Sequence, residues 1–550
     1  MRAQAKSGVN KTVTDPQLPA QPRTQADSPS YATAQDKRAA TTRPILECAA
    51  VTLLALIVFF FHLGSYGLWE PDEARYAEIA REMLSGGNLL VPHLNYVPYI
   101  EKPPLLYWMT TLAFHFLGVN EFAARFVPGA SALCGVLLTY WFGRCAFDHR
   151  RAILAAAILT TSPLYAVMAQ VLTTDMLLTA LLSVAFFAFY AQWRSGGRWW
   201  LAMYAAAALA VLTKGPVGVI LPGLAGLLFL WRQGALRGSI KNFHVVAGAL
   251  LVAAVALPWF AIMAVRLPGF VQFYVVGEHF RRVFVSTYSH NEPFYFYLPV
   301  ILLGLLPWSI CLPLLLIDAT RGPARSLCAI AAGVVVVLFS AADAKLIPYV
   351  LPALPPLALL LADSILSALE PRVMRWPRLN TGSVVAAIGP ALCVGGVACI
   401  VVAMAGSHIR NRDVALLGQV ILTIGAVLLA GGAAATAAFL RNRSEAGLAL
   451  IAATTALALL IGSYGRIKVE ALHSYAPLSR ELALQAPAST LIDYHRYPQA
   501  IPFYTGRRVI LAGPFRSELG FGAQHSPDRA QYFLDSDADL LNLWARDPSP

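Results

Sequence analysis

Carboxylates and cations cluster directly after the first long apolar segment, where the chain reads Trp69-Glu70-Pro71-Asp72-Glu73-Ala74-Arg75-Tyr76. A second charged pair, Glu101-Lys102, precedes two prolines. Ionisable groups close to hydrocarbon are costly, so they are kept for ion paths, catalysis or phosphate binding. Carboxylates suit proton transfer or the stabilisation of positive charge, and Lys and Arg suit anionic oxygens. These two segments are therefore the first candidates for a functional site.

The composition places this chemistry at a membrane. Of 550 residues, 57% are hydrophobic and only 13% are charged, and the mean hydropathy is +0.59. These values predict an all-α polytopic membrane protein. The net charge of +12 comes from short basic loops between apolar runs, a pattern typical of cytoplasmic loops that argues against a nucleic-acid partner. The seven cysteines lie in or beside apolar runs, so neither a disulfide framework nor a zinc knuckle is predicted.

Apolar segments of spanning length predict about thirteen transmembrane helices. They lie near 45–66, 126–145, 152–171, 175–193, 199–213, 215–231, 244–265, 297–317, 326–341, 346–368, 381–405, 414–440 and 446–463. The aromatic stretch 104–118 is short, and we interpret it as an interfacial helix, because a span there would turn every later basic loop outward. Residues 1–44 predict a disordered cytoplasmic tail, with no cleavable signal peptide before the first span.

This topology gathers the remaining charged loops on one outer face. A membrane domain at 45–463 carries a first outer loop at 67–125 and a later one at 266–296, and residues 464–550 predict a small α/β domain on the same side. Each charged group also has an ordinary explanation, as a helix cap, a solvated turn, the end of a span or an anchor for lipid headgroups. Because the whole set lies on one face, a shared functional site is favoured over these separate explanations. The set comprises Asp72, Glu101, Asp175, Lys214, Glu278, His279, Arg281, Arg282, His290 and Lys345.

An enzyme on the outer face has no ATP or nucleotide sugar at hand, and the chain has neither a G-x-x-x-x-G-K-[ST] nor a G-x-G-x-x-G motif. It needs a donor that is already activated in the lipid, such as a polyprenyl-phosphate sugar. That donor requires a carboxylate near the sugar, cations at the phosphate and an apolar groove for the tail. We predict that Asp72 or Glu73 acts at the sugar or acceptor. Phosphate binding is predicted for Arg75, Lys102, Arg281, Arg282 and Lys345, and a groove at the membrane surface for Tyr76, Tyr96, Tyr99, Trp108 and His115.

Several motifs resemble the GT-C superfamily of lipid-dependent glycosyltransferases, in particular the bacterial family that transfers 4-amino-4-deoxy-L-arabinose to lipid A. Protein O-mannosyltransferases are more distantly similar. The resemblance covers roughly residues 45–365. It rests on WEPDEARYAEIAREML (69–84), VPYIEKPPL (97–105), TKGP (213–216), GEHFRRVF (277–284), NEPFYFYLPV (291–300) and LFSAADAKLIPYVLPALPPLALL (338–360).

The resemblance implies an inner-membrane enzyme whose active site faces the periplasm. It implies an undecaprenyl-phosphate-aminoarabinose donor, lipid A phosphates as acceptor, surrounding membrane lipids as partners, and resistance to polymyxin. Asp72 matches the family's essential acid, and Arg75, Tyr76 and Lys102 match its donor-phosphate neighbourhood. Asp175 matches an acidic position in the second outer loop and joins the catalytic candidates. Glu101 and Lys214 are further candidates for the groove.

Two other functions remain open from the sequence. Transfer to a protein hydroxyl or another envelope glycan would need a real general base, whereas a lipid A phosphate oxygen is already ionised near neutral pH. A transporter or flippase would place charges near the middle of its spans, and here they lie in the loops. No cofactor is expected to be required. A divalent metal is left open at Glu101, Glu278 and His279, although the histidines His279 and His290 lack metal-ligand spacing.

Overall fold

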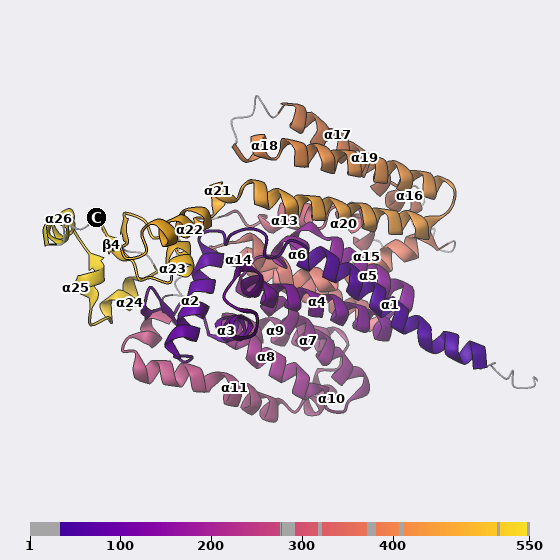
Figure 1. Ribbon diagram of the computed structural model, residues 1–550. Coiled ribbons are helices and arrows are strands. Elements are labelled where there is room, and N and C mark those ends of the chain that lie inside the picture. The colour runs from indigo at the N-terminus through magenta and orange to yellow at the C-terminus, as the bar shows by residue number, and fades with distance from the viewer. Residues whose placement is uncertain are drawn as a thin grey trace, which may run out of the picture. The chain divides into compact units, whose positions relative to one another are not determined.

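Long apolar helices make up most of the structure, and Figure 1 shows how they run beside one another. The computed structural model describes residues 34–274, 277, 292–316, 322–370, 381–405, 412–513 and 518–546. The chain divides into two units, Met1–Glu47 and Cys48–Pro550, and the candidate site lies wholly in the second. Within the described residues, eight helices are long and apolar enough to cross a membrane, and four shorter apolar helices accompany them. The prediction of a helical protein that crosses the membrane several times is confirmed.

The elements fall into four groups along the chain. The apolar bundle comprises α1 (Ala34–Phe60), α4 (Glu121–Ala146), α5 (His149–Thr161), α6 (Pro163–Met168), α7 (Thr174–Ser195), α8 (Trp199–Lys214), α9 (Val217–Arg232), α10 (Leu236–Ser239), η1 (Ile240–Phe243), α11 (Val245–Arg266), α13 (Tyr297–Gly304), η3 (Trp308–Leu316), α14 (Pro323–Ala341), η4 (Ile347–Ala353) and α15 (Leu354–Leu369). The first loop carries α2 (Asp72–Gly86), β1 (His93–Leu94), β2 (Val97–Pro98) and α3 (Leu105–Leu117).

A second helical group follows, made of α16 (Thr381–Ala386), α17 (Ile388–Ala405), α18 (Arg412–Leu416), α19 (Gly418–Leu440) and α20 (Ser444–Lys468). The C-terminal region contains α21 (Glu470–His473), α22 (Ala476–Gln485), β3 (Ile492–Tyr494), α23 (Ala500–Thr505), β4 (Ile510–Ala512), α24 (Gly520–Gln524), α25 (Arg529–Tyr532), β5 (Phe533–Leu534) and α26 (Asp537–Arg546).

Proline interrupts two of the predicted spans. The predicted span at 152–171 is two helices, α5 and α6, which separate at Ser162-Pro163. The predicted span at 297–317 is α13 followed by η3, with Pro307 between them. A proline has no backbone N–H with which to continue the helical hydrogen bonds, which explains both interruptions. Thirteen continuous spans are therefore not reproduced in the described parts of the chain.

Helix α3 lies in the stretch that the sequence left ambiguous. It has 13 residues, a length of about 20 Å at the α-helical rise, whereas the hydrocarbon core of a bilayer is roughly 30 Å thick. It packs against α2 and α4 rather than standing alone. This length fits the interfacial helix that the sequence predicts.

Burial separates central helices from peripheral ones. The apolar windows of Thr174–Ser195 and Ile347–Leu369 are 83% and 89% buried, whereas those of Thr381–Ala405 and Gly418–Leu440 are 28% and 22% buried. A helix that is apolar all round is buried by other helices or faces lipid. Helices α7 and α15 therefore form the centre of the bundle, whereas α17 and α19 pack against each other with most of their surface exposed, as expected of helices that face lipid. Figure 1 shows α17 and α19 side by side.

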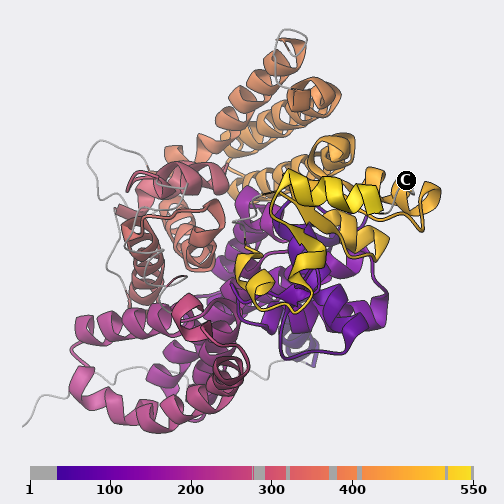
Figure 2. The ribbon, with the colours of Figure 1, turned by 90° about the vertical axis from the view of Figure 1, so that its left-hand side faces the viewer.

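The C-terminal region forms a parallel sheet in the order β3-β4-β5, with Ile492 opposite Ile510 and Ala512 opposite Leu534. Strands and helices are both present in this region, but it belongs to the same compact unit as the membrane helices, so a separate C-terminal α/β domain stays a prediction. Its helices pack on the first loop, α23 against α2 and α24 against β2. Figure 2 shows these C-terminal elements, in orange and yellow, beside the indigo first loop. The C-terminal region is thus part of the wall around the first-loop charges.

Candidate active site

A buried ion pair fixes the first loop to the bundle. Glu73, in the first turn of α2, is 3% exposed, and Arg125, in α4, is fully buried. The Nε and Nη2 groups of Arg125 donate to the two carboxylate oxygens of Glu73 at 2.9 and 2.8 Å. The backbone N–H groups of Trp69 and Leu172 donate to the same carboxylate at 3.0 and 3.1 Å. The remaining Arg125 hydrogen bonds go to the carbonyl oxygens of Leu63, Tyr66 and Gly67.

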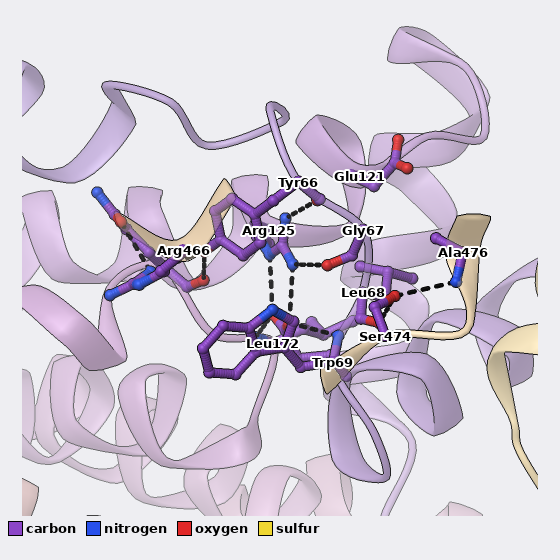
Figure 3. A network of polar contacts seen from close by, with 12 residues as sticks. Tyr66, Gly67, Leu68, Trp69, Glu121, Arg125, Leu172, Arg466, Ser474 and Ala476 are labelled. Carbon is purple, nitrogen blue, oxygen red and sulfur yellow. Dashed lines mark hydrogen bonds and ion pairs between the residues drawn. The ribbon is translucent and has the colours of Figure 1, made fainter. Parts of the chain in front are cut away.

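Each oxygen of the Glu73 carboxylate thus accepts one hydrogen bond from Arg125 and one from a backbone N–H. Figure 3 shows Arg125 and Leu172 in this network. Burial opposes ionisation of Glu73, but the charge and hydrogen bonds of Arg125 outweigh it and hold the pKa of Glu73 below its ordinary value. The carboxylate is therefore a fixed, ionised partner of Arg125. Nothing in these contacts supports the catalytic role predicted for Glu73.

Asp72, by contrast, lies at the surface, with a side chain that is 52% exposed. Its Oδ1 is 3.4 Å from Nη1 of Arg75, one helical turn further along α2. Acidic residues in a first turn favour helix formation, so the ordinary explanation also holds for Asp72. Its exposure nevertheless leaves the carboxylate accessible to a ligand.

Arg75 is held from the C-terminal region as well. Its Nη2 lies 3.1 Å from Oε1 of Glu518, and Gln499 donates a side-chain hydrogen bond to the same oxygen. Burial opposes the charge on Arg75, but the neighbouring Tyr99 and Glu518 outweigh it and raise the pKa of Arg75 well above its ordinary value. Sequence reasoning missed Glu518, because nothing in the local pattern connects it to a residue more than four hundred positions away.

A second ion pair joins two helix ends. Asp175 lies in the first turn of α7 and Lys214 in the last turn of α8, and Lys214 Nζ donates to Asp175 Oδ1. The same ammonium group lies 3.9 Å from the ring centroid of Tyr349, a cation–π distance. Thr173, which precedes α7, makes no side-chain capping bond. Asp175 is therefore a partner of Lys214 and not the N-cap residue of the helix.

Lys214 also lies at the mouth of a groove with a volume of about 820 Å³. Glu101 and Lys102 line the same mouth, and the hydroxyl of Tyr99 donates to Glu101 Oε2 at 3.0 Å. Helices α9 and α14 form apolar walls below it. The wall residues are Val217, Ile220, Leu224, Leu228, Ile330, Gly333, Val334, Val337, Leu338 and Phe339. A charged mouth above an apolar groove suits an amphipathic ligand with an anionic head.

Tyr76 connects the two charged segments. It is buried, and its ring packs against Tyr107 with centroids 5.9 Å apart. Burial raises the pKa of Tyr76 well above its ordinary value, and the negative charges of Asp72, Asp175 and Glu101 raise it further. The predicted acids of the first loop, the second outer loop and the groove thus lie around one tyrosine.

The remaining predicted charged residues have other contacts or lie outside the described chain. Lys345 is buried, and its Nζ donates to the carbonyl oxygen of Glu292 at 2.8 Å. The predicted phosphate ligands Arg281 and Arg282, and the predicted metal ligand His279, lie outside the described residues. Within the described residues, no group of three potential metal ligands comes together. The metal and the Arg281-Arg282 contacts stay predictions.

Comparison with known proteins connects this geometry to an activity. A family model described as dolichyl-phosphate-mannose-protein mannosyltransferase matches residues 101–262. Two relatives, from Pectobacterium carotovorum subsp. carotovorum and Pectobacterium atrosepticum, are 29% and 30% identical over 90% of this chain and 89% of their own. Both are named undecaprenyl phosphate-alpha-4-amino-4-deoxy-L-arabinose arabinosyl transferase.

A solved structure shows the same fold. The crystal structure of ArnT from Cupriavidus metallidurans bound to undecaprenyl phosphate superimposes with a TM-score of 0.80 at 28% identity, covering 92% of this chain and 91% of that one. Its apo form gives a TM-score of 0.79 at 27% identity, with the same coverage. The prediction of an enzyme is confirmed, and the alternative of a transporter or flippase is rejected. This chain is a multi-span membrane glycosyltransferase and belongs to the undecaprenyl phosphate-aminoarabinose arabinosyl transferase family.

Proposed function

We propose that this protein transfers 4-amino-4-deoxy-L-arabinose from undecaprenyl phosphate to a phosphate group of lipid A, on the periplasmic face of the inner membrane. The groove below Lys214 is the observation that carries the proposal. A polyprenyl tail matches its apolar walls, and Lys102 and Lys214 supply positive charge where the phosphate would lie. The basic connectors between spans support the orientation, because they favour the cytoplasmic side.

The reaction needs no strong base in this scheme. The ionised acceptor phosphate attacks the anomeric carbon, the bond from that carbon to the undecaprenyl phosphate oxygen breaks, and undecaprenyl phosphate leaves with the electron pair. Negative charge builds up on the leaving phosphate, where Lys102 and Lys214 stabilise it. Asp72 is accessible, and we assign it to the ammonium group of the sugar or to the positive charge that develops on the ring.

The product has less negative charge at the cell surface. An aminoarabinose group masks a phosphate and adds an ammonium group, so cationic peptides such as polymyxin bind the surface more weakly. Resistance to polymyxin follows from this charge change and is part of the proposal.

Mass spectrometry of lipid A tests the proposal directly. The gene is expressed in a polymyxin-sensitive host that makes the donor lipid but lacks its own transferase. The expected result is a mass gain of one aminoarabinose with the wild-type chain, and none with Asp72→Ala or Lys102→Ala. Asp535→Ala and Lys241→Ala are matched controls, since the first removes a carboxylate that is 69% exposed and the second an exposed lysine, both outside the groove. No gain with the wild-type chain, in cells shown to contain the donor, would refute lipid A as the acceptor.

Transfer to a protein hydroxyl is the second candidate, and the mannosyltransferase family match over residues 101–262 favours it. A hydroxyl needs a general base, and Asp72 is the accessible carboxylate for that role. The same cells distinguish the two candidates, because aminoarabinose would then appear on envelope proteins and lipid A would keep its mass.

A further inference from the structure

A pocket with a volume of about 570 Å³ lies among the ends of α5, α15 and α20. Its walls come from the first turn of α5, the last turn of α15 and the turn that leads into α20. None of its lining residues lines the groove below Lys214, as the structure describes the two. The lining carries charges of both signs, on Arg150, Arg151, Arg443, Glu370 and Glu445.

This pocket lies on the membrane face opposite the candidate active site. At the far end of α20, Arg466 donates to the hydroxyl of Tyr66, directly before the first loop, at 2.7 Å, and Figure 3 shows the two side by side. Helix α20 has 25 residues, a length of about 38 Å, whereas the hydrocarbon core of a bilayer is roughly 30 Å thick. Helix α4 agrees, because its Arg125 pairs with Glu73 near one end and its other end, Ala146, leads into α5.

Two arginines of the lining already have partners. Arg150 pairs with Glu445, and Arg151 Nη2 donates to Oε1 of Glu370 at 3.2 Å. Arg151 Nε also donates to Asp363 of α15 at 2.7 Å, so this arginine links α5 to α15. These pairs leave the lining close to neutral, which argues against a ligand with a large net charge.

One arginine and the start of a helix remain for an anionic group. Within the described residues, Arg443 is the arginine of the lining without a carboxylate partner. It precedes α20 and makes no side-chain capping bond, and its carbonyl oxygen accepts from the N–H of Gly447 at 3.0 Å. The N–H groups before Gly447 have no acceptor within the helix and lie at the positive end of its dipole. A phosphate group is the ligand that this combination suits.

Both carboxylates of the lining keep one oxygen for a further cation. Glu370 and Glu445 accept through Oε1, and within the described residues Oε2 of each makes no hydrogen bond. The two side chains are 53% and 76% exposed, so a ligand can reach them. A primary ammonium group has three N–H donors and can bind between such oxygens.

Leucines supply an apolar side to the same pocket. Leu366 and Leu369 come from α15 and Leu448 from α20, and both helices belong to segments long and apolar enough to cross a membrane. The charged groups at the ends of these helices therefore lie at the level of lipid headgroups, with the leucines beside them. A ligand with a charged head and an apolar tail fits this arrangement.

We propose that this pocket binds a zwitterionic phospholipid, whose head carries a phosphate and a primary ammonium group, in the leaflet opposite the candidate active site. Its phosphate contacts Arg443 and the start of α20, its ammonium group contacts Glu370 and Glu445, and one acyl chain lies on the leucines. Such a lipid bridges α20 to α5 and α15, which pack beside it. It takes no part in the proposed glycosyl transfer.

Two substitutions separate the phosphate contact from the ammonium contact. Arg443→Gln is expected to raise the apparent Kd for phosphatidylethanolamine and for phosphatidylglycerol about tenfold each, as for the loss of one charged hydrogen bond, because both lipids carry a phosphate. Glu370→Gln is expected to raise the apparent Kd for phosphatidylethanolamine alone, because phosphatidylglycerol has no ammonium group. Arg441→Gln and Glu481→Gln are matched controls that remove exposed charges outside the lining, and we expect them to change neither value.

Native mass spectrometry of the purified full chain measures how well each lipid is retained. The Tm in detergent with each lipid is a second readout, because a ligand that binds only the folded chain raises the Tm. Without lipid, the four variants are expected to keep a Tm near the wild-type value, since the changed side chains are exposed.

The wild-type chain is expected to retain phosphatidylethanolamine above both phosphatidylglycerol and phosphatidylcholine, whose quaternary ammonium group has no N–H to donate. Displacement of phosphatidylethanolamine by soluble phosphoethanolamine, and not by inorganic phosphate, would support recognition of the whole headgroup. Equal retention of the three lipids would overturn the proposal. Unchanged retention of phosphatidylethanolamine in both Arg443→Gln and Glu370→Gln would overturn it as well.

Discussion

Two ion pairs lie close to the membrane face of this protein, and they are built in opposite ways. Glu73 and Arg125 are enclosed, and backbone N–H groups donate to Glu73 while backbone carbonyl oxygens accept from Arg125. Asp175 and Lys214 form one contact with each other, and Lys214 then turns to the ring of Tyr349 and to the groove. The first pair has no capacity left for a ligand, whereas the second borders the space where one would bind.

The difference shows that charge near a membrane is no sufficient sign of catalysis. A buried pair in which every donor and acceptor is used holds a chain segment in place. In a pair at the mouth of an apolar groove, the electric field of the cation can still act on an incoming anion. The number of partners around each group separates the two roles.

Breaking the enclosed pair should have the largest effect. Glu73→Gln leaves the Arg125 charge buried without its counter-ion, at an expected cost of about 3–5 kcal/mol in the free energy of unfolding. Loss of the folded protein is expected, measured as monodisperse yield in detergent and as Tm. The double variant Glu73→Gln, Arg125→Met removes both charges and is expected to recover part of the yield. A stable Glu73→Gln protein that had lost only its turnover would reverse the structural assignment.

Breaking the groove pair should act on the reaction instead. Asp175→Asn and Lys214→Gln keep side-chain size and lose the charges at the mouth. We expect kcat/KM to fall about a hundredfold, typical of removing one group that stabilises developing charge. The Tm is expected to fall less than that of Glu73→Gln, because the Lys214 side chain keeps 12% exposure and lines the groove, where solvent can reach the remaining charge. A loss of yield as large as that of Glu73→Gln would make this pair structural as well.

Glu518 offers a smaller test of how the C-terminal region supports the site. Glu518→Gln removes the charge of the ion pair with Arg75 and keeps a side-chain oxygen that can accept a hydrogen bond from Gln499. We expect the donor KM to rise roughly threefold to tenfold with kcat little changed, since the lost contact is one charged hydrogen bond. Glu481→Gln is the matched control in the same region, because Glu481 is exposed and its carboxylate accepts a hydrogen bond from the side chain of exposed Gln485.

The sequence predicted the parts of this site that depend on local pattern. Asp72, Glu101 and Lys102 stand out because charges are rare beside apolar runs, and Lys214 because it ends one. The helical fold followed from hydropathy in the same way, although the prolines at 163 and 307 interrupted spans that composition alone made continuous.

The local sequence pattern could not predict ion pairs and hydrogen bonds between residues that are far apart in the chain. Arg125 looks like an ordinary charge at the edge of an apolar segment, and only the fold shows that it closes on Glu73. Glu518 and Arg466 were missed for the same reason, since their partners Arg75 and Gln170 are hundreds of residues away. The local sequence shows only that an arginine ends an apolar segment. This indicates that the cation needs a partner, but the sequence does not indicate which residue that partner is.

Glu70 gives the most specific effect, because it is a half-buried carboxylate that, within the described residues, is held by backbone N–H groups and not by an arginine. It accepts from the backbone N–H groups of Gln499 and Ala500 at 3.2 and 2.7 Å, and burial raises its pKa to about 7. The backbone N–H groups and Arg75 act against this shift, and Glu518 adds to it. Burial, together with the charge of Glu70, likewise raises the pKa of Asp493 to about 7.

The sign of the pH effect follows from these raised values. The pKa of Glu70 is higher in the folded chain than the value of 4.5 expected in the unfolded chain. Its contribution to the free energy of unfolding is therefore fully present below pH 4.5 and is lost as the pH rises to about 7. The change corresponds to at most roughly 3 kcal/mol for Glu70. Glu70→Gln stays neutral, so its Tm relative to wild type is expected to rise between pH 5 and pH 7.5. A constant difference across that range would show that Glu70 is ionised throughout, as Glu73 is, and that backbone N–H groups alone can replace an arginine.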